Sequence, residues 1–391
     1  MTEIRLIATE SEQRASQHLG LLAFGGDLAA PFDPSQFNDS ALRFGAFDGD
    51  RLAAKLTIRP YEQVFGGQPV SMGGIAGVAV APEDRGRGLA QQLLQAAIER
   101  MHVDGQVIST LYQTAMGLYR TMGWELGGSM PSVAVRTVDL ARARGGDEVT
   151  IRACTEADVE SVGSLYASYI RERNGMLTRT GPSFPAGPKG VLGLDGVPLA
   201  VRAGAIVGYA SYSRGSGYGP ESQLRVHDLV GADAGAIAAL LRHLSTWSSV
   251  AAASTFRWSA DDAAGLLLPD ALAAPVEERR WMLRLVDLAG AMAGRGWPRG
   301  VNLTVDLEVR DEQAEWNEGT WQLNVADGKA EVREGGAGNV RCTIHALASL
   351  YTGAFDARTL MRAGTLSAAE GDLDTLDLMF AGPPSTMWDY F

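Results

Sequence analysis

The sequence predicts a mixed α/β protein, of the α+β type, built from three consecutive domains. Two stretches, residues 1–142 and 143–280, share one order of elements: a short strand, a helix, several β-rich runs and a second helix. Residues 281–391 instead combine strands joined by polar turns with short helices. A length of 391 residues agrees with two or three domains. Because a strand meander followed by a crossover helix gives a mixed sheet, we expect such a sheet in the first domain and its repeat in the second.

Composition indicates a globular protein without disulfides or a metal site. Apolar residues make up 46% and charged residues 20% of the chain. The two cysteines, Cys154 and Cys342, lie far apart, and the five histidines show no metal-ligand spacing. No apolar run could span a membrane, and the opening MTEIRLIATE lacks the apolar core of a signal peptide. We therefore expect a cytoplasmic protein without a metal, and the net charge of −12 argues against nucleic acid as a partner.

Turn signals divide the first domain into short elements. Asp48-Gly49 between two apolar runs predicts a hairpin, and Gly66-Gly67 predicts a second turn. Ser11 is placed to cap the first helix. The expected strands are residues 4–6, 42–47, 51–59, 68–80, 106–112 and 132–138, and a short helix is expected at 117–122.

The first domain is organised around residues 78–101, which read VAVAPEDRGRGLAQQLLQAAIERM. Small apolar residues at 78–80 suit a buried strand end, and apolar residues recur at helical spacing from Leu89 onward. Between them stands Arg-Gly-Arg-Gly at 85–88. The first N–H groups of a helix lack intrahelical partners, and glycines let the backbone approach a ligand closely. With two guanidinium groups added, the stretch predicts an anion site that fits a pyrophosphate.

The spacing excludes two common phosphate loops. No Gly-Lys-Ser/Thr follows, and the glycines do not match the dinucleotide fingerprint. The plain alternative is an arginine-rich surface turn, but the strand before it and the long helix after it favour the anion site. The stretch resembles the acetyl-CoA loop of the GNAT N-acetyltransferase superfamily. The resemblance implies acetyl-CoA as acetyl donor and assigns to it Val78, Ala79, Val80, Arg85, Gly86, Arg87, Gly88, Leu89, Ala90, Gln91, Thr114 and Ala115.

The second domain repeats this plan without the loop. A polar linker at 143–147 precedes it. At the position of Arg-Gly-Arg-Gly it has Gly-Ala-Asp-Ala-Gly at 231–235, with no arginine, and Asp233 would repel a pyrophosphate. We therefore expect a degenerate GNAT fold without a cofactor site. Its expected strands are residues 149–152, 190–194, 199–201, 205–212 and 224–230. One expected helix holds Val159, Val162, Leu165, Tyr166 and Ile170, and the other runs from 234 to 247.

The third domain resembles the sterol carrier protein type 2 fold, with strands expected at 302–309, 320–325 and 329–332. The order of the three domains resembles the enhanced intracellular survival family of acetyltransferases. Three further motifs carry this resemblance: GLYRTMGW at 117–124, SLYTGAFDARTLMRAGTL at 349–366 and the terminal MWDYF. It covers essentially the whole chain and implies a homo-oligomer, in that family a hexamer.

Acetyl transfer to an amine needs a donor for the carbonyl oxygen, a proton acceptor and a proton donor for the leaving thiolate. The resemblance assigns hydrogen bonding to the carbonyl oxygen to the backbone N–H of Val80, and protonation of the leaving thiolate to Tyr119. The phenol of Tyr119, with a pKa of ~10, suits a thiolate of similar basicity. It assigns proton acceptance to the terminal carboxylate of Phe391, and places Asp27 in the acceptor pocket. The alternatives are a core tyrosine, a tail docked only for packing and an ordinary surface aspartate.

The sequence therefore predicts an acetyl-CoA-dependent N-acetyltransferase. The resemblance implies aminoglycosides or polyamine-like amines as acceptors, attacked directly in a ternary complex. A first alternative is acetylation of lysine on a peptide or protein. A second, from another class, is a non-catalytic protein that binds coenzyme A and carries an apolar ligand in its third domain; Tyr119, the Arg-Gly-Arg-Gly loop and the aromatic terminus argue against it.

Overall fold

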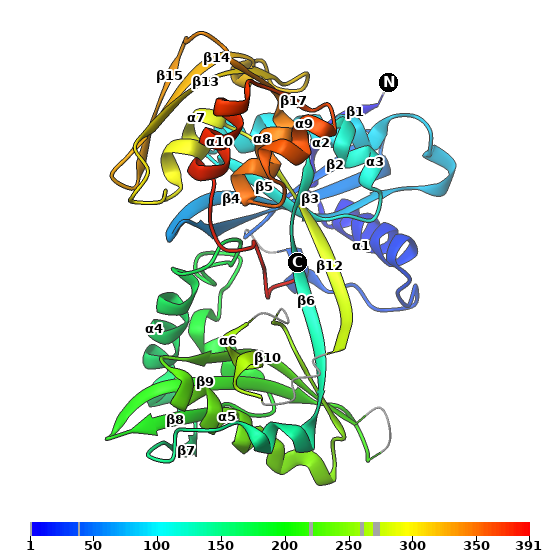
Figure 1. Ribbon diagram of the computed structural model, residues 1–391. Helices are drawn as coiled ribbons and strands as arrows, with labels where there is room; N and C mark the ends of the chain where they lie inside the picture. The colour runs from blue at the N-terminus through cyan, green and yellow to red at the C-terminus, as the bar shows by residue number, and fades with distance from the viewer. Residues whose placement is uncertain (1, 38–39, 219–221, 259–261, 269–273) are drawn as a thin grey trace.

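The computed structural model of the chain describes residues 2–37, 40–218, 222–258, 262–268 and 274–391. It confirms a mixed α/β fold in which three parts follow one another along the chain (Figure 1). The first part contains β1 (Glu3–Leu6), α1 (Glu10–Phe24), β2 (Leu42–Asp48), β3 (Arg51–Phe65), β4 (Gln68–Val80), α2 (Leu89–Val103), β5 (Ile108–Tyr112), α3 (Met116–Thr121) and β6 (Glu125–Arg136).

Local sequence explains where α1 begins. Thr9 is its N-cap: the Thr9 hydroxyl accepts from the N–H of Glu12, and the Glu12 carboxylate accepts from the N–H of Thr9 at 3.0 Å. This reciprocal pair needs Thr and Glu three residues apart. The expectation that Ser11 caps the helix is therefore wrong, because Ser11 already lies in the first helical turn.

The second part contains β7 (Thr150–Ala153), α4 (Val159–Ile170), β8 (Pro198–Arg202), β9 (Ala205–Arg214), β10 (Gln223–Gly231), α5 (Ala234–Ser245), β11 (Ala253–Phe256), α6 (Ala263–Leu266) and β12 (Ala274–Leu285). The strand expected at 190–194 is wrong, because Gly187–Gly193 forms a 3₁₀ helix. Pro188 near its start and the glycines around it disfavour a strand, so the local turn preference prevails.

The first two parts share one twelve-stranded sheet, in the order β1-β2-β3-β4-β5-β12-β6-β11-β10-β9-β8-β7. β12 comes last in the second part, yet it pairs with β5 of the first, with Trp281 opposite Tyr112 and Leu285 opposite Ile108. β6 lies on its other side and continues into pairing with β11. β6 and β12 thus run side by side between the two halves (Figure 1), and the domain boundary expected at 280/281 falls inside β12.

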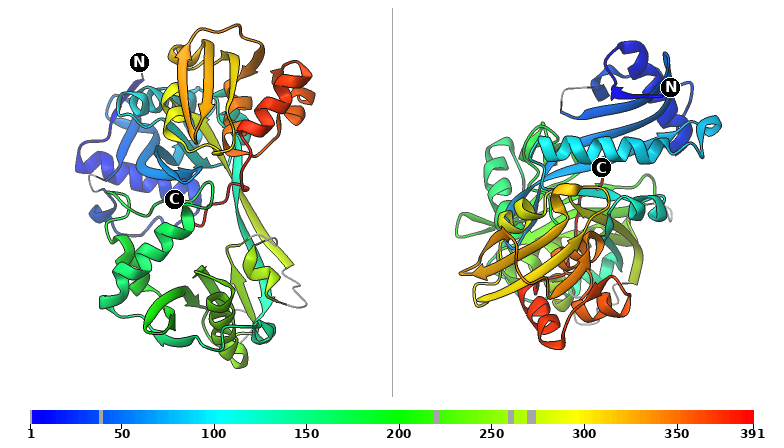
Figure 2. Two further views of the ribbon diagram at one scale, coloured as in Figure 1. Left: turned by 60° about the vertical axis from the view of Figure 1, so that its left-hand side comes forward. Right: turned by 90° about the horizontal axis from the view of Figure 1, so that it is seen from above.

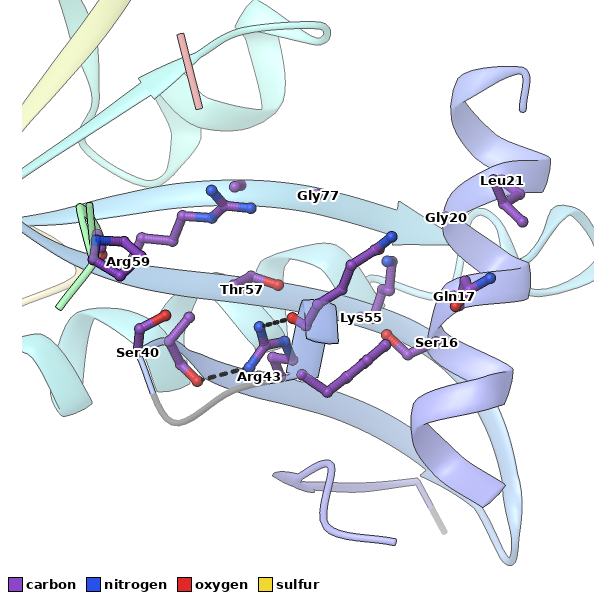
Figure 3. A pocket seen from close by; sticks show the side chains of 16 residues that line it. Ser16, Gln17, Gly20, Leu21, Ser40, Arg43, Lys55, Thr57, Arg59 and Gly77 are labelled. Atoms are coloured by element: carbon purple, nitrogen blue, oxygen red, sulfur yellow. Dashed lines mark hydrogen bonds between the residues drawn. The ribbon is translucent and has the colours of Figure 1, made fainter. Parts of the chain in front are cut away.

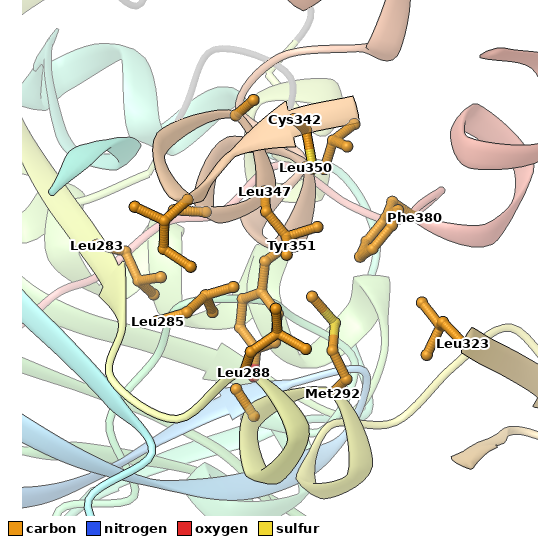
Figure 4. Close-up of a cluster of buried hydrophobic side chains, with 14 of the residues drawn as sticks. Leu283, Leu285, Leu288, Met292, Leu323, Cys342, Leu347, Leu350, Tyr351 and Phe380 are labelled. Carbon is orange, nitrogen blue, oxygen red and sulfur yellow. The ribbon is translucent and has the colours of Figure 1, made fainter. Parts of the chain in front are cut away.

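The third part has a five-stranded sheet, in the order β15-β14-β13-β16-β17. Its apolar interior is continuous with the first part, since Tyr351 and Leu347 pack in one cluster with Phe65 of β3 and Met72 of β4. Leu283 and Leu285 of β12 belong to the same cluster (Figure 4). Its elements are α7 (Leu288–Gly294), β13 (Leu303–Arg310), β14 (Gly319–Ala326), β15 (Lys329–Glu334), β16 (Val340–Thr343), α8 (Ile344–Thr352), α9 (Ala357–Arg362), β17 (Leu366–Ser367) and α10 (Glu370–Met379).

After α10 the C-terminal segment, residues 380–391, returns to the junction of all three parts (Figures 1 and 2). Met387 donates its N–H to the carbonyl of Ser129 on β6 at 3.0 Å, and Thr386 donates to the carbonyl of Asn174 in the second part at 2.9 Å. Met387 and Trp388 are buried. The segment is therefore part of the core between the domains rather than a loose end.

Candidate active site

β4 and β5 are parallel neighbours over only part of their length. Met72, Gly73 and Gly74 of β4 pair with Ile108, Ser109 and Thr110 of β5. Beyond Gly74, the described residues 75–80 make no ladder pairs with β5. On the β3 side the register shifts between Lys55 and Thr57, and Gly77 takes a φ of 59°, so β4 contains a bulge at this point. The two strands therefore separate and leave backbone groups of β4 open to an extended ligand.

The Arg-Gly-Arg-Gly loop stands at the open end of this separation. Gly88, with a φ of 74°, is the N-cap of α2 and supplies no side chain to the first helical turn. The N–H groups at Leu89, Ala90 and Gln91 consequently face the loop without a capping side chain. No heavy atom lies within 4 Å of the position where a Cβ on Gly86 would stand. The loop can thus accept a phosphate, as the sequence predicts.

The side chain of Arg87 differs from the sequence expectation. Its guanidinium donates to Asp84 and, at 2.7 Å, to Asp48, instead of extending into the loop. Arg51 donates to the same Asp84 at 2.6 and 3.0 Å, and the Asp84 side chain is only 5% exposed. Both arginines are exposed, but Arg87 braces the loop against β2 and β3 through its carboxylate partners. The hydrogen bonds to Asp48 and then Asp84 raise the pKa of Arg87 above its usual range.

Tyr119 lies on α3 and is 4% exposed. It packs in a cluster with Leu89 and Leu93 of α2, and its hydroxyl lies near the side chain of Thr114, just past the end of β5. Burial raises the pKa of Tyr119, with a smaller opposing effect of the nearby Thr114 side chain. The phenol therefore keeps its proton at neutral pH, as a general acid must.

The ring of Phe391 lies where β4 and β5 separate. Its centroid is 4.8 Å from that of Tyr61 on β3 and 5.8 Å from that of Tyr112 on β5. A Cβ on Gly74, the last paired residue of β4, would stand 2.8 Å from this ring. Phe391 packs with the cluster that contains Tyr61, and Tyr119 packs with the cluster on the α2 side. The two predicted catalytic residues thus belong to different clusters, and the ring of Phe391 is the one that lies against Gly74.

Residues of the second part hold the C-terminal segment, and no sequence motif marked them. Arg179 donates to the carboxylate of Asp389 at 2.9 Å and, through both terminal nitrogens, to that of Asp228 at 2.9 Å each. Arg257 donates to the carbonyl of Trp388. Arg179 is 210 residues from Asp389 along the chain, so local periodicity carries no signal for this contact.

A cavity of about 450 Å³ lies beside the strand separation (Figure 3). Ala76 and Gly77 of β4 form one wall, α1 contributes Ser16 and Gly20, and the second part contributes Ser183. Asp27, expected in this pocket, is exposed instead and does not line it: its carboxylate accepts from the N–H of Ala29 at 2.9 Å. The remaining lining residues are Gln17, Leu21, Gln36, Phe37, Ser40, Ala41, Arg43, Lys55, Thr57, Arg59 and Pro185.

In the second part, α5 takes the place of α2, and a carboxylate of the chain itself caps its N-terminus. Asp233 is the N-cap of α5 and accepts from the N–H of Ala236 at 2.9 Å. Arg202 donates to both oxygens of Asp233, at 2.6 and 2.9 Å. An anion at this helix would have to displace a paired carboxylate, which agrees with the expected loss of the cofactor site.

Within the residues that the structure describes, no group of three or more His, Cys, Asp or Glu side chains is arranged to hold a metal ion. No helix in the same residues is long and apolar enough to cross a membrane.

Comparison with known protein families agrees with this architecture. Residues 4–127 match an acetyltransferase (GNAT) domain, residues 190–285 match a second acetyltransferase (GNAT) domain, and residues 288–388 match a sterol carrier protein domain. The chain therefore carries the N-acetyltransferase fold twice, followed by a sterol carrier protein domain. The second match includes β12, the strand that completes the sheet of the first part.

Solved structures resemble the chain over its whole length. GCN5-related N-acetyltransferases from Anabaena variabilis and Kribbella flavida are each 29% identical, with TM-scores of 0.90 and 0.87; the matches cover all of this chain and 100% and 99% of theirs. Eis1 from Mycobacterium abscessus is 20% identical, with a TM-score of 0.78 and full coverage of both chains, and shows the shared fold.

Curated relatives match only a short stretch. The L-methionine sulfoximine/L-methionine sulfone acetyltransferase of Pseudomonas aeruginosa is 43% identical over 61 residues, which are 14% of this chain and 36% of that protein. The same protein from Pseudomonas paraeruginosa matches equally well. The chain thus spans about a third of the length of the curated relatives that it matches.

Proposed function

We propose that the chain is an acetyl-CoA-dependent N-acetyltransferase that transfers acetyl directly to an amine in a ternary complex. The observation that carries the proposal is the separation of β4 from β5, with the glycine loop at its open end, Phe391 beside it and Tyr119 near Thr114 just past the end of β5. Such an opening takes an extended chain along the backbone of β4 and its charged end at the start of α2.

In this mechanism the N–H groups at the start of α2 hold the pyrophosphate, and Arg85 adds a cation. Backbone groups of Val78, Ala79 and Val80 pair with the pantetheine arm, and the N–H of Val80 polarises the acetyl carbonyl. Thr114 and Ala115 lie at the end of β5, beside the thioester. Binding both substrates in one opening supplies the proximity that a direct attack needs.

The amine nitrogen then forms a bond to the carbonyl carbon, and the bond between that carbon and sulfur breaks. The α-carboxylate of Phe391 takes the proton that the amine loses, and Tyr119 gives a proton to the departing thiolate. The products are an acetylated amine and coenzyme A. The position of the Phe391 ring beside Tyr61 and Tyr112 supports this assignment.

A thiol-release assay with acetyl-CoA and a panel of amines tests the proposal. We expect release that depends on both substrates, with the acetylated amine as the product by mass spectrometry. Binding of coenzyme A without transfer to any amine would contradict the proposal and favour the non-catalytic binding protein.

The acceptor class has less support than the reaction. Aminoglycosides and polyamines, the acceptors implied by resemblance, are polycations, whereas the cavity beside the strand separation is lined by Arg43, Lys55 and Arg59. Peptide lysines are the alternative acceptor. The panel should therefore include an aminoglycoside, spermidine and a lysine peptide.

The hexameric assembly and the cytoplasmic location stay predictions, and light scattering tests the hexameric assembly.

A further inference from the structure

The chain contains only three lysines, Lys55, Lys189 and Lys329. Lys189 and Lys329 are exposed, whereas Lys55 on β3 is half-buried and lines the cavity beside the strand separation (Figure 3). The helix α1 leaves room for its side chain, since a Cβ on Gly20 would stand 2.7 Å from the Nζ of Lys55. Lys55 therefore differs from the other two lysines in being held inside the fold.

The sheet register brings Lys55 next to the residues that the proposed function assigns to acetyl-CoA. Lys55 is paired with Ala79 of β4. Further along β4, the N–H of Ala81 donates to the carbonyl of Ala53 on β3 at 2.8 Å. Because backbone groups alternate in direction along a strand, the N–H of Val80 points away from β3, toward the separation of β4 from β5. The acetyl carbonyl that we assign to this N–H is thus held one strand away from Lys55.

Lys55 and Tyr119 belong to opposite faces of the sheet. Paired residues of neighbouring strands share a face, so Lys55 lies on the face of Ala79, which packs with Leu19 of α1. The next residue of β3, Leu56, points to the other face and packs in one cluster with Tyr119. The flexible four-carbon stem of a lysine is longer than the spacing of about 4.8 Å between neighbouring strands. The amine of Lys55 can therefore reach across β4 from one face, while the phenol of Tyr119 belongs to the other.

Burial also makes the amine of Lys55 a better nucleophile at neutral pH. Burial, and secondarily the charge of Arg43, lower the pKa of Lys55 to about 8. About one Lys55 side chain in ten is then neutral at pH 7, against about one in 3,000 for a lysine with the usual pKa of 10.5. Only the neutral amine can attack a thioester, and desolvation is one of the ways in which proteins activate a lysine. Lys55 thus has the reactivity of an acetyl acceptor as well as the position of one.

We infer that the protein acetylates its own Lys55 when acetyl-CoA is bound without another amine. The inference rests on the proposed function. The Nζ of Lys55 forms a bond to the acetyl carbonyl carbon, and the bond between that carbon and sulfur breaks. The nitrogen releases one proton to solvent, and Tyr119 gives one proton to the departing thiolate. The products are a Lys55 side chain acetylated on Nζ, which is neutral, and coenzyme A.

Mass spectrometry after incubation with acetyl-CoA alone tests this inference. The full-length protein is measured intact and as mapped peptides, before and after incubation without any added amine. We expect one added acetyl group on Lys55, at a rate about tenfold or more above the rates at Lys189 and Lys329, because only Lys55 is held beside the thioester. The two exposed lysines report spontaneous acetylation in the same sample. Equal rates at all three lysines would overturn the inference.

Two variants separate a catalysed reaction from a spontaneous one. Tyr119→Phe should slow acetylation of Lys55 about 10²–10⁴-fold and leave the rates at Lys189 and Lys329 unchanged. Any acetyl group that Lys55 carries before the incubation should likewise be absent from this variant. Lys55→Arg keeps the positive charge and should gain no acetyl group beyond the background at the two exposed lysines. Normal melting curves establish folding. Equal acetylation of Lys55 in Tyr119→Phe and in the unaltered protein would contradict the inference, because the reaction would then depend on the amine alone.

A mixture of the two variants tests whether each chain acetylates itself. Tyr119→Phe offers Lys55 without the proton donor, and Lys55→Arg offers the proton donor without that lysine. We expect no catalysed acetylation of Lys55 in the mixture, because a half-buried amine on β3 cannot enter the site of another chain. Acetylation of Lys55 at the rate of the unaltered protein would show transfer between chains and reject the inference.

An added amine separates this inference from the proposed function. Transfer of acetyl to an amine of the panel, by a protein whose Lys55 stays unmodified when that amine is left out, would retain the acetyltransferase and reject self-acetylation. Acetylation of Lys55 that requires Tyr119, in a protein that acetylates no added amine, would retain self-acetylation and reject the transfer to a free amine.

Discussion

Arg179, in the second part of the chain, bridges Asp228 beside it and Asp389 near the end of the C-terminal segment. Its guanidinium makes hydrogen bonds of 2.9 Å to each carboxylate, and its side chain is 18% exposed. Asp389 is two residues before Phe391, and its carbonyl accepts from the hydroxyl of Tyr112 at 2.8 Å. The second acetyltransferase (GNAT) domain thus anchors the segment that brings Phe391 to the first domain.

Asp389→Asn should lower kcat and leave KM for acetyl-CoA unchanged. The change weakens the bond between Arg179 and the C-terminal segment, and it keeps the pair of Arg179 with Asp228, so the buried guanidinium is not left unpaired. Steady-state kinetics with both substrates varied is the measurement. Asp374→Asn on α10 is the control, since it removes an exposed pair with Arg358 of small energetic value. Equal kcat in the two variants would mean that the anchor does not position Phe391.

Tyr119→Phe should reduce turnover by about 10²–10⁴-fold, the range of general acid catalysis, with cofactor affinity preserved. The ring that packs in one cluster with Leu89 and Leu93 remains, so the change removes only the hydroxyl. Pre-steady-state measurement of thiol release isolates the chemical step. Full turnover where chemistry limits the rate would assign Tyr119 to packing alone.

Local pattern predicted much of the first domain. The turn at Gly66-Gly67 and the strand at 68–80 agree with β4, and the helix after Gly88 agrees with α2, because turn glycines and apolar periodicity act over a few residues. Such reasoning is less reliable at a helix end. Thr9, and not the nearby Ser11, is the N-cap of α1, because Thr9 and Glu12 form a reciprocal pair of hydrogen bonds.

The sequence did not predict contacts between residues that lie far apart along the chain. β12 lies between β5 and β6, and Arg179 meets Asp389, yet each partner is far away along the chain and has no periodic signature. The cationic lining of the cavity was not predicted for a similar reason, because Arg43 and Lys55 become neighbours only through the register of β2 with β3. The anion loop could thus be predicted from residues adjacent in sequence, whereas the cavity could be found only from the fold.

The two arginines of the loop should behave differently. Arg85→Ala should raise KM for acetyl-CoA about tenfold or more, the effect of losing a charged hydrogen bond to phosphate, with an unchanged melting temperature. Arg87→Ala should also lower the melting temperature, because Asp84 and Asp48 lose a partner.

Calorimetry with coenzyme A should give one site per chain. Two sites would contradict the closure of α5 by Asp233.

The stability of the protein should depend on pH through Lys55. Its folded-state pKa is about 8, below the usual value of 10.5, so between these values the unfolded chain binds more protons than the folded chain. The destabilisation from Lys55 is therefore complete below pH 8 and fades as the pH rises toward 10.5. Lys55→Met should raise the melting temperature at pH 7 more than at pH 10. An equal shift at both pH values, relative to the control Lys329→Met at an exposed position on β15, would mean that Lys55 is solvated.

Extension of the chain beyond Phe391 should abolish most of the activity. An added residue converts the α-carboxylate of Phe391 into an amide, which cannot accept a proton, and it moves the new carboxylate ~3.5 Å per residue away. Removal of Phe391 alone should also be severe, because the carboxylate of Tyr390 falls short by one residue. A tag at the N-terminus should have no such effect.

The competing view is that the C-terminal segment docks only for packing. It expects a short polar C-terminal tag to be tolerated, because Trp388 stays buried and the ring of Phe391 keeps its contacts with Tyr61 and Tyr112. Turnover and thermal melting, measured side by side for untagged, N-tagged and C-tagged protein, separate the two. Loss of turnover at a normal melting temperature in the C-tagged protein alone supports the carboxylate as base. Full activity at a normal melting temperature in that protein would reject Phe391 as the base and direct the search to groups around the cavity.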